Sequence, residues 1–493
     1  MSNLRNLLLY QINTRVWLTS LSETLGRAAT LDDIPDAELD RLAELGFDWV
    51  WFLSVWQTGL AGQRVSRANA GWRVEFQETL PDLRDDDIAG SGFAITAYSV
   101  PADLGGDAAL ARLRGRLAKR AMKLMLDFVP NHMALDHPWV EDHPEYFVSG
   151  TEELLAREPQ NYIRIKRKKD DLILAYGRDP YFSGWPDTLQ LDYSNTATQE
   201  AMIGELEKIA GQCDGVRCDM AMLALPEVFE QTWGRKPAPF WPRAVQRARE
   251  RTADFCFMAE VYWDLEWTLQ QQGFDFTYDK RLYDRLRESH ARPVREHLHA
   301  QFDYQIKLAR FLENHDEPRA SAVFDPRVHR AAAVIVYSIP GLRFFHQGQF
   351  EGRKVRISPH LVRGAEEFPD KEIEEFYDQL LAILRKPIMK SREWQQLICH
   401  QAWSENETWD SFIAHSWRAS GGERMLVAVN YAPHSSQCYV CLPFPEIKNC
   451  TVRLEDLLSS ACFIRSGDKL LERGLYLDMG AWSYHILILE VTP

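Results

Sequence analysis

Short apolar runs alternate with amphipathic stretches along most of the chain. Eight of these runs predict β-strands, and helical patterns such as residues 107–121 lie between most of them. The predicted strands are residues 8–17, 47–55, 121–129, 214–220, 255–263, 274–279, 307–314 and 341–347. Eight repeated strand–helix units predict a closed parallel (β/α)8 barrel with its helices outside.

Two segments depart from this repeat and predict further domains. Residues 133–192, between the third and fourth strands, are rich in His, Pro, Trp and Tyr and predict a short inserted subdomain, subdomain B. Beyond about residue 390, alternating runs such as 425–433 and 482–491 replace the helical pattern and predict a C-terminal β-sandwich over 391–493. The barrel is therefore assigned to residues 1–132 and 193–390.

Composition and charge narrow the possible partners. Of the 493 residues, 45% are hydrophobic and 26% charged, which is typical of a folded globular protein. The net charge of −14 gives no attraction to nucleic acid or to anionic membranes, so neither is expected as a partner. The basic run at residues 164–169 is followed by Asp170 and Asp171, and we interpret it as a solvated loop, with an RNA-binding patch as the alternative.

The N-terminus and the cysteines predict a cytoplasmic protein. The apolar run at residues 7–10 is too short for a signal sequence or a membrane span. The eight cysteines lack the density and regularity of a disulfide scaffold, so reduced thiols are expected. Cys438 and Cys441 form a C-x-x-C in an alternating segment, where neighbouring strand residues are favoured over a zinc site.

Acidic residues end four of the predicted strands. In a barrel of this kind the reacting groups lie at the carboxyl ends of the strands, where the loops converge on one cavity. The residues at these ends are Asp127, Asn131, His132, Arg217, Asp219, Glu260, Asn314, His315 and Asp316. Cleavage of a glycosidic bond with retention needs one carboxyl group to protonate the leaving oxygen and a second, about 5 Å away, to attack the anomeric carbon. Asp219 and Glu260 follow successive strands, as that separation requires.

These segments resemble the conserved regions of glycoside hydrolase family 13, the α-amylase family. The D-x-x-x-N-H pattern is present at residues 127–132, G-x-R-x-D at residues 215–219 and N-H-D at residues 314–316, and Glu260 matches the acid of the fifth strand. The order and spacing agree over nearly the whole chain. The resemblance implies a TIM barrel that acts on α-glucans.

The resemblance also implies a role for each acid. Asp219 would be the nucleophile, kept ionised by the guanidinium of Arg217. Glu260 would be the general acid/base, which requires a raised pKa in a less polar environment. Asp316 would bind sugar hydroxyls and favour the distorted ring near the transition state.

Further substrate-binding residues follow from the same comparison. The resemblance implies that His132 and His315 donate hydrogen bonds to hydroxyls of the sugar at the cleavage point. Asp127 would brace Arg217. Asn314 would complete the N-H-D segment as a substrate-binding residue.

Two segments differ from the family pattern. In the family's G-Y-x-x-x-D-Y motif this chain has Phe93, which can still stack on a sugar ring, and Ala97. Many members follow the nucleophile with a Lys-His pair, whereas this chain has Met222 and Leu223. Apolar residues there would remove polar contacts on the leaving-group side and favour a small, transferred or unusual acceptor. The alternative is that both are core residues of a rebuilt loop.

A metal ion is not expected. Gln190 falls where calcium-dependent members place a carboxylate, and calcium prefers several oxygen ligands that carry negative charge. Asn131 remains a candidate ligand, so a structural calcium is the alternative. Downstream, Arg353, Lys354 and Arg356 are interpreted as a solvated loop, with contact to an anionic substrate as the alternative.

The sequence therefore predicts a retaining glycoside hydrolase that acts on α-glucans or maltooligosaccharides by double displacement. A transglycosylase, glucanotransferase, isomerase or phosphorylase would use the same glycosyl-enzyme and remains an alternative. A non-catalytic carbohydrate-binding relative is a further alternative, which the presence of all three acids disfavours.

Overall fold

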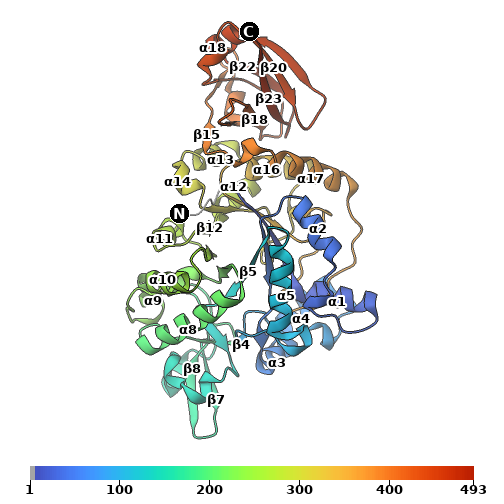
Figure 1. Ribbon diagram of the computed structural model, residues 1–493. Coiled ribbons are helices and arrows are strands. Elements are labelled where there is room, and N and C mark those ends of the chain that lie inside the picture. The colour runs from blue at the N-terminus through green and yellow to red at the C-terminus, as the bar shows by residue number, and fades with distance from the viewer. Residues whose placement is uncertain (1–5, 493) are drawn as a thin grey trace.

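The computed structural model describes residues 6–492, and its central feature is the predicted closed barrel. Eight parallel strands are hydrogen-bonded in the order β1-β14-β13-β12-β11-β10-β5-β2 and close on themselves (Figure 1). All eight predicted strands are present, in the predicted order. They are β1 (Leu8–Asn13), β2 (Trp49–Leu53), β5 (Lys123–Phe128), β10 (Gly215–Cys218), β11 (Cys256–Ala259), β12 (Phe276–Tyr278), β13 (Leu308–Arg310) and β14 (Leu342–His346).

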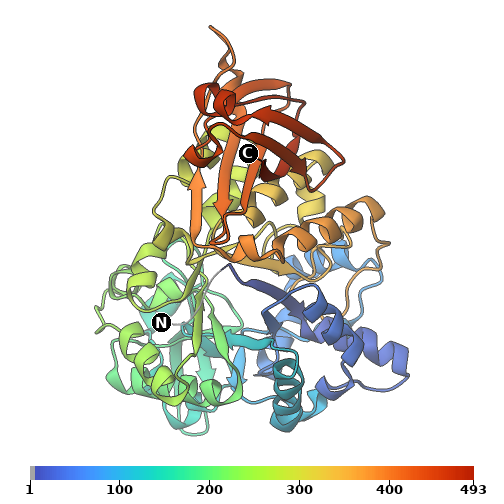
Figure 2. The same ribbon diagram turned by 45° about the horizontal axis from the view of Figure 1, so that its top comes forward.

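Helices surround the barrel and bury the outer faces of its strands (Figures 1 and 2). Because both faces of each strand are covered, the strands consist almost entirely of buried residues. The helices are α1 (Thr14–Leu25), α2 (Asp36–Glu44), α3 (Leu60–Ala68), α4 (Ala70–Thr79), α5 (Gly106–Ala118), α8 (Thr196–Gln212), α9 (Pro226–Trp233), α10 (Trp241–Arg251), α11 (Glu266–Gln271), α12 (Lys280–Arg287), α13 (Ala291–His297), α14 (Phe302–Gln305), α15 (Ala320–Val323), α16 (Pro326–Ser338) and α17 (Lys371–Leu384). A two-stranded sheet of β3 (Gln57–Thr58) and β4 (Ile95–Ala97) lies in the long segment after β2.

The first strand is shorter than predicted. The sequence predicts a strand over residues 8–17, but β1 ends at Asn13 and α1 begins at Thr14. The reason is local, because the Asn13 side chain accepts a hydrogen bond from the backbone N–H of Val16 at 3.3 Å and caps the helix. The change from strand to helix therefore occurs directly at the carboxyl end of the barrel.

The segment between β5 and α8 forms a lobe at the end of the molecule opposite the C-terminal domain (Figure 1). Its base is the antiparallel pair of β6 (His132–Ala134) and β9 (Thr188–Gln190), and its tip is the hairpin of β7 (Tyr162–Lys166) and β8 (Asp171–Ala175). Short helices α6 (Trp139–Asp142) and α7 (Glu152–Arg157) complete it.

The prediction of a solvated loop for the basic run at residues 164–169 is wrong for its first half and correct for its second half. Residues 164–166 belong to β7, and residues 167–169 form the turn of the hairpin. Two of the basic side chains are neutralised within the lobe, because Arg164 pairs with Glu152 and Arg167 pairs with Asp170. Neighbouring carboxylates therefore offset the positive charge that suggested a solvated loop.

The C-terminal region forms two packed antiparallel sheets, as predicted. Nineteen buried residues, among them Phe412, Leu426, Val452 and Leu487, form the core between the sheets. The larger sheet has the order β15 (Glu393–Gln396), β17 (Phe412–Arg418), β18 (Arg424–Asn430), β23 (Tyr484–Thr492), β20 (Thr451–Asp456) and β21 (Cys462–Ser466). The smaller sheet has the order β16 (Cys399–Gln401), β19 (Ser436–Val440) and β22 (Leu475–Met479), and helix α18 (Gly467–Arg473) lies between β21 and β22.

The sandwich is attached to the barrel by apolar packing and hydrogen bonds. Trp417 and Val427 belong to the same continuous apolar core as the barrel strands. The indole N–H of Trp417 donates to the carbonyl of Ser338 at the end of α16 at 2.7 Å, and the hydroxyl of Tyr431 donates to the carbonyl of Leu286 at 2.7 Å. Both acceptors are backbone carbonyls near helix ends, which need such donors.

The eight cysteines all lie within the described residues, and none of them forms a disulfide there. Cys438 is a buried residue of β19, whereas Cys441 directly follows that strand, so one of the two cysteines of the C-x-x-C lies in the sheet. Residues 6–492 contain no helix with the length and apolar character needed to cross a bilayer.

Candidate active site

The carboxyl ends of neighbouring strands bring the predicted acids together. Strand β10 pairs with β5 on one side and with β11 on the other, in registers that place Arg217 opposite Asp127 and opposite Met258. Asp219 directly follows β10 and Glu260 directly follows β11. The backbone N–H of Asp219 donates to the carbonyl of Phe128 at 2.8 Å, which holds this turn against the end of β5.

One buried guanidinium connects the two carboxyl groups. Nη1 of Arg217 lies 2.6 Å from Oδ1 of Asp219, and Nη2 lies 2.7 Å from Oε2 of Glu260. Burial of Arg217 opposes its charge, but Glu260 and the other surrounding acids raise its pKa above the ordinary value. Groups bound to two nitrogens of one guanidinium lie side by side, so both acids face the same small space.

Glu260 has the environment of a proton donor. Burial is the main cause that raises its pKa to about 7, and the negative charges of Asp219 and Asp316 add to the effect, while Arg217 opposes it. Its Oε2 accepts a hydrogen bond from the backbone N–H of Met220 at 2.7 Å. Its Oε1 accepts one from the hydroxyl of Tyr262 at 2.8 Å. The carboxyl group is therefore held in one orientation.

Asp316 lies at the open side of the cluster. Its side chain is 41% exposed, whereas those of Asp219 and Glu260 are 8% and 5% exposed, so the entrance to the site is beside Asp316. Its Oδ2 lies 3.9 Å from Nη2 of Arg217. The Asn314 side-chain oxygen accepts the backbone N–H of Asp316 at 2.8 Å, so this oxygen shapes the loop.

His315 connects Asp316 to the interior of the barrel. Its Nε2 lies 3.0 Å from Oδ2 of Asp316, and its Nδ1 lies 2.8 Å from the amide nitrogen of Gln11 in β1. An amide nitrogen only donates, so Nδ1 accepts and the proton of the neutral ring lies on Nε2, where it has no hydrogen-bond partner within the described residues. Burial lowers the pKa of His315 to about 4, which keeps the ring neutral.

Aromatic rings surround the Arg217 guanidinium. The centroids of Phe93, Trp51 and Tyr278 lie 5.3, 5.4 and 5.8 Å from its central carbon. Phe93 also lies beside His315, with ring centroids 5.5 Å apart. Phe93 thus packs against the guanidinium and His315 at once.

Asp127, which was predicted to brace Arg217, forms no hydrogen bond or ion pair with it within residues 6–492. The two oxygens of Asp127 instead accept hydrogen bonds from the indole N–H of Trp51 at 3.1 Å and from the backbone N–H of Ser54 at 2.9 Å. Asp127 therefore positions Trp51, and the ring of Trp51 in turn packs against Arg217. The error has a simple cause, because residues opposite one another on adjacent strands need not have touching side chains.

His132 lies at the end of β5, where the inserted lobe begins. Its ring packs edge-on against Trp185 with centroids 5.2 Å apart, and its Nδ1 lies 3.4 Å from the amide nitrogen of Asn131. Burial lowers the pKa of His132 to about 4, so it is a neutral hydrogen-bonding group.

Gln190 is hydrogen-bonded to Asn131, the candidate calcium ligand. Its amide nitrogen lies 3.0 Å from both the side-chain oxygen and the backbone oxygen of Asn131, and 3.1 Å from the backbone oxygen of Leu191. Its own oxygen accepts the backbone N–H of Arg178 at 3.3 Å. The Asn131 oxygens that calcium would require already accept hydrogen bonds from Gln190. Among the described residues, no three His, Cys, Asp or Glu side chains gather as possible metal ligands.

Met222 and Leu223 are core residues, as the alternative interpretation of the sequence has it. Their exposed fractions are 0% and 3%, and they lie in a short turn after Asp219. The exposed residues on the loop after Glu260 include an aromatic ring. Trp263, three residues after Glu260, packs edge-on against Tyr181 of the inserted lobe with ring centroids 5.0 Å apart. Tyr181, Phe182 and Trp263 are 61%, 71% and 38% exposed, and we call them the aromatic rim.

Comparison with known proteins identifies the family. Residues 30–409 match the family model for the catalytic domain of alpha-amylases, which covers most of the chain. The chain belongs to the alpha-amylase family. The predicted resemblance is thereby confirmed, and the buried Arg217 cluster lies within the matched region of this family member.

Individual relatives of this alpha-amylase family member are distant. Alpha-amylase MalA of Haloarcula japonica is 22% identical over 365 residues, which cover 71% of this chain and 44% of that protein. An alpha-1,4-glucan:maltose-1-phosphate maltosyltransferase of Arcanobacterium haemolyticum is 26% identical over 259 residues, covering 52% of this chain and 31% of that protein. The chain thus spans less than half the length of these curated relatives.

Solved structures share the fold of this alpha-amylase family member. The maltogenic alpha-amylase AmyB of Thermotoga neapolitana aligns over 99% of both chains with a TM-score of 0.69 and 19% sequence identity. At that identity the likeness concerns the fold.

Three residues of the site escaped the sequence analysis. Gln11 orients His315, Tyr262 holds Glu260, and Trp51 lies between Asp127 and Arg217. Gln11 had a recognisable signal, because it is a polar residue within an otherwise apolar strand. Tyr262 and Trp51 had none, since aromatic residues are common in buried strands and loops.

Proposed function

We propose that this alpha-amylase family member is a retaining glycoside hydrolase that cleaves α-glucosidic bonds of maltooligosaccharides or α-glucans. One observation carries the proposal: the Arg217 guanidinium binds Asp219 and Glu260 through its two terminal nitrogens, at the carboxyl end of the barrel. Two carboxyl groups side by side, one of them with a raised pKa, are what double displacement requires.

In the first step the Asp219 carboxylate attacks the anomeric carbon. A bond forms between Asp219 and that carbon while the bond from the carbon to the leaving oxygen breaks. The proton of Glu260 passes to the leaving oxygen, so the departing sugar leaves neutral. Arg217 holds Asp219 in position. Glu260 is protonated before this step, and the loss of its negative charge weakens its ion pair with Arg217.

In the second step Glu260 works as a base. The Glu260 carboxylate takes a proton from water, the water oxygen forms a bond to the anomeric carbon, and the bond to Asp219 breaks. Asp316 and His315 would bind hydroxyls of the same sugar, Asp316 through its carboxylate and His315 through its unpartnered Nε2 proton. Two displacements at one carbon restore its original configuration.

Transfer to a second sugar is the other candidate activity, and the aromatic rim favours it. Tyr181, Phe182 and Trp263 present exposed rings, and Trp263 follows Glu260 by three residues on the loop after β11, so the rim would lie on the side where an acceptor enters. Sugar rings stack on such faces, so an acceptor held there would compete with water for the glycosyl-enzyme. The maltosyltransferase relative is consistent with this second candidate.

Analysis of initial products tests the proposal. With maltotetraose alone we expect shorter sugars, one new reducing end for each bond cleaved, and retained α configuration at the new end. With added maltose we expect products longer than the substrate as a minor fraction. Trp263→Ala should lower that fraction at least about twofold, because one stacking contact contributes roughly 0.5–1.5 kcal/mol.

A matched control distinguishes the loss of a rim residue from the general effect of removing an exposed tryptophan. Trp267→Ala removes an exposed tryptophan of α11 outside the rim and should leave the ratio of products unchanged. Absence of any cleavage of α-glucosides would contradict the proposed function. If cleavage strictly required inorganic phosphate, the activity would be phosphorolysis and not hydrolysis.

The pH dependence of kcat/KM follows from Glu260. This residue acts as an acid in the first step, so its protonated form is required. Because its pKa is about 7, activity should fall about tenfold per pH unit above that value. Tyr262→Phe removes a donor that stabilises the charged form and should move this limb to higher pH, by up to about one unit. If kcat/KM did not fall up to pH 9, the general acid would be a group other than Glu260.

The proposal includes no metal ion, and the hydrogen bonds of Gln190 to Asn131 support this. It also places the enzyme in the cytoplasm, which the unpaired cysteines support.

A further inference from the structure

Two long segments that follow the carboxyl ends of barrel strands are joined to one another beside the active site. The first is residues 57–95, between β2 and α5, and contains helices α3 and α4 (Figure 1). The second is residues 347–370, between β14 and α17. Strands β14 and β2 are the two neighbours of β1 in the barrel, so both segments start on the same side of its mouth. We call the two segments together the β1-side wall.

Ion pairs connect the two segments of the wall. Arg356 of the second segment pairs with Glu75 of α4. Arg363 pairs with Asp82 at 3.0 Å and with Asp87 at 2.8 Å. Asp87 is buried, and the hydrogen bonds that it accepts from Arg363 are the main cause that lowers its pKa. The second segment is therefore attached to the first at two separate places.

Apolar packing joins the segments between these ion pairs. The ring of His360 packs on Trp72 and Phe76 of α4, with centroids 4.7 and 5.7 Å apart. Its Nδ1 lies 2.8 Å from the hydroxyl oxygen of Ser66 in α3. Phe76 and Leu361 also belong to one small apolar cluster that is separate from the barrel core. Because the wall has a core of its own, it is a packed unit and not a pair of mobile loops.

The wall is also attached to the barrel and to the inserted lobe. Arg15, at the start of α1, donates to the carbonyl of Gly90 at 3.0 Å and to the hydroxyl of Thr58 at 3.0 Å. Farther along the first segment, the backbone N–H of Ala61 donates to the Asp136 carboxylate of the lobe at 2.9 Å. The wall thus extends from the loop after β14, past the end of β1, to the base of the lobe.

The inner edge of the wall lies at the catalytic residues. Phe93 belongs to the first segment, and its ring packs against both Arg217 and His315. Gly92 permits this close approach, because a Cβ atom there would clash with the hydroxyl oxygen of Ser54 at the end of β2. The wall therefore begins where the sugar at the cleavage point would bind.

The wall lies on the side of the barrel mouth opposite the general acid. In the order of the closed barrel, β1 and β11 are four strands apart in either direction, so Glu260 and the wall face one another across the mouth. The general acid protonates the leaving oxygen, so the leaving group lies on the side of Glu260. In an α-1,4-glucan the next sugar toward the non-reducing end is attached at C4, across the ring from the anomeric carbon. The non-reducing part of the chain would therefore point at the wall.

We propose that the β1-side wall makes the enzyme exo-acting, so that it accepts an α-glucan by its non-reducing end and releases short sugars from that end. A chain that continued in that direction would have to displace packed side chains. The low exposure of Asp219 and Glu260 agrees with a closed pocket, and the more exposed Asp316 marks its entrance. This inference rests on the proposed cleavage of α-glucosidic bonds.

Three forms of maltoheptaose test the inference with the full-length protein. One is unmodified, one carries a 4,6-O-benzylidene cap on its non-reducing sugar, and one is reduced to the alditol at its other end. The cap should lower kcat/KM by at least about a hundredfold, because overfilling a packed site is strongly unfavourable. Reduction of the other end should change kcat/KM by less than about threefold, because that end lies outside the pocket. Titration calorimetry with Asp219→Asn should give the same order of affinities without turnover.

Variants that loosen the wall should reduce this discrimination. Arg363→Ala removes the ion pairs of the second segment with the first, and Trp72→Ala removes the packing of α4 against His360. Each should raise the ratio of kcat/KM for capped to unmodified sugar at least about threefold, because local opening becomes more frequent. The matched control is Arg73→Ala, since Arg73 pairs with Asp85 at 2.9 Å within the first segment, and this variant should leave the ratio unchanged.

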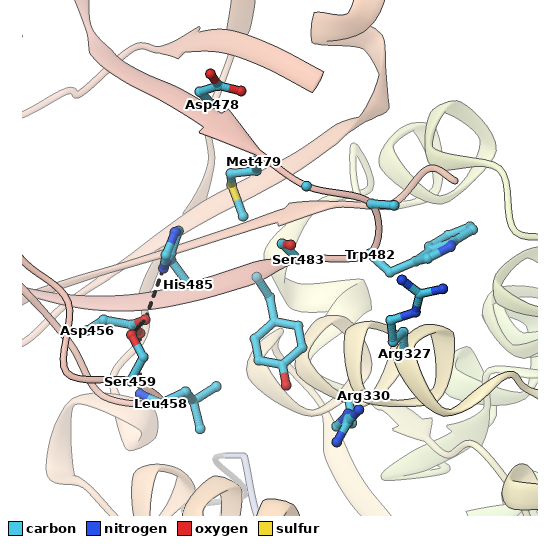
Figure 3. Close-up of a pocket in the computed structure, with 13 residues that line it drawn as sticks. Arg327, Arg330, Asp456, Leu458, Ser459, Asp478, Met479, Trp482, Ser483 and His485 are labelled. Carbon is cyan, nitrogen blue, oxygen red and sulfur yellow. Dashed lines mark hydrogen bonds and ion pairs between the residues drawn. The ribbon is translucent and has the colours of Figure 1, made fainter. Parts of the chain in front are cut away.

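A second control lies far from the wall in the chain. Arg330 projects from α16 and lines a cavity of about 510 Å³ at the C-terminal sandwich (Figure 3). Arg330→Ala should leave the ratio unchanged, because none of the residues that line this cavity belongs to the wall.

The outcomes separate this inference from the proposed function. Equal cleavage of capped and unmodified maltoheptaose would show an endo-acting enzyme and overturn the inference, while the proposed function would stand. A ratio that changes in neither Arg363→Ala nor Trp72→Ala would also overturn it, because the wall would not be the cause of the discrimination. If no sugar is cleaved, the proposed function fails, and equal affinity of Asp219→Asn for capped and unmodified sugar would then overturn the inference as well.

Discussion

Asp219→Asn is expected to reduce kcat on maltooligosaccharides by more than about a thousandfold, because an amide cannot form the glycosyl-enzyme. The fold should persist, since the asparagine oxygen can still accept the hydrogen bond that Arg217 donates at 2.6 Å. Binding of maltooligosaccharides should also be largely retained. Initial rates, the thermal unfolding midpoint and equilibrium binding measure the three quantities on one preparation.

The matched control for this substitution is Asp264→Asn. Asp264 is an exposed aspartate on the loop after β11, and it pairs with the exposed Arg281. It should retain full activity, because exposed ion pairs contribute little and Asp264 does not belong to the cluster of acids. If the Asp219→Asn variant were as active as the parent enzyme, the proposed mechanism would be wrong.

Glu260→Gln is expected to affect substrates according to their leaving groups. With maltooligosaccharides, whose leaving oxygen needs a proton, kcat/KM should fall by about a hundredfold to ten-thousandfold. With an activated aryl α-glucoside the first step needs little protonation, so kcat/KM should fall far less. Comparison of the two substrate classes in parent and variant measures the difference.

The second step provides an internal check on Glu260. The variant also lacks the base that activates water, so the glycosyl-enzyme should accumulate with an activated substrate. Azide needs no base, and its addition should raise turnover of the variant and yield an α-glycosyl azide. The exposed Glu227, which pairs with Lys236, provides the control Glu227→Gln. An equal loss on both substrate classes, with no effect of azide, would give Glu260 another role.

Much of the fold could be predicted from the sequence because the signals are local. Each barrel strand is a short apolar run, and the burial of both faces makes such runs stand out. The boundaries were less accurate where capping decides them, as Asn13 does at the end of β1. The β7–β8 hairpin was missed because charged residues dominate its tip, and its pairing depends on a partner strand that composition does not reveal.

The active-site residues likewise fall into two groups: those that a local sequence motif reveals and those that depend on the folded structure. Asp219, Glu260 and Asp316 could be found because each follows a recognisable strand within a spaced motif. The contact of Asp127 with Trp51, the contact of Gln11 with His315 and the aromatic rim depend on side-chain directions and on segments far apart in the chain. The rim in particular joins residue 181 of the lobe to residue 263 after β11, a separation that no local pattern specifies.

The single guanidinium between two acids couples their states. When Glu260 is a carboxylate, Asp219 and Glu260 share the positive charge of Arg217; when Glu260 gains its proton, that charge becomes available to Asp219 alone. Proton uptake at the donor and stabilisation of the attacking group are then one event. The resting enzyme would therefore acquire a protonated Glu260 and a fully stabilised Asp219 carboxylate at the same time.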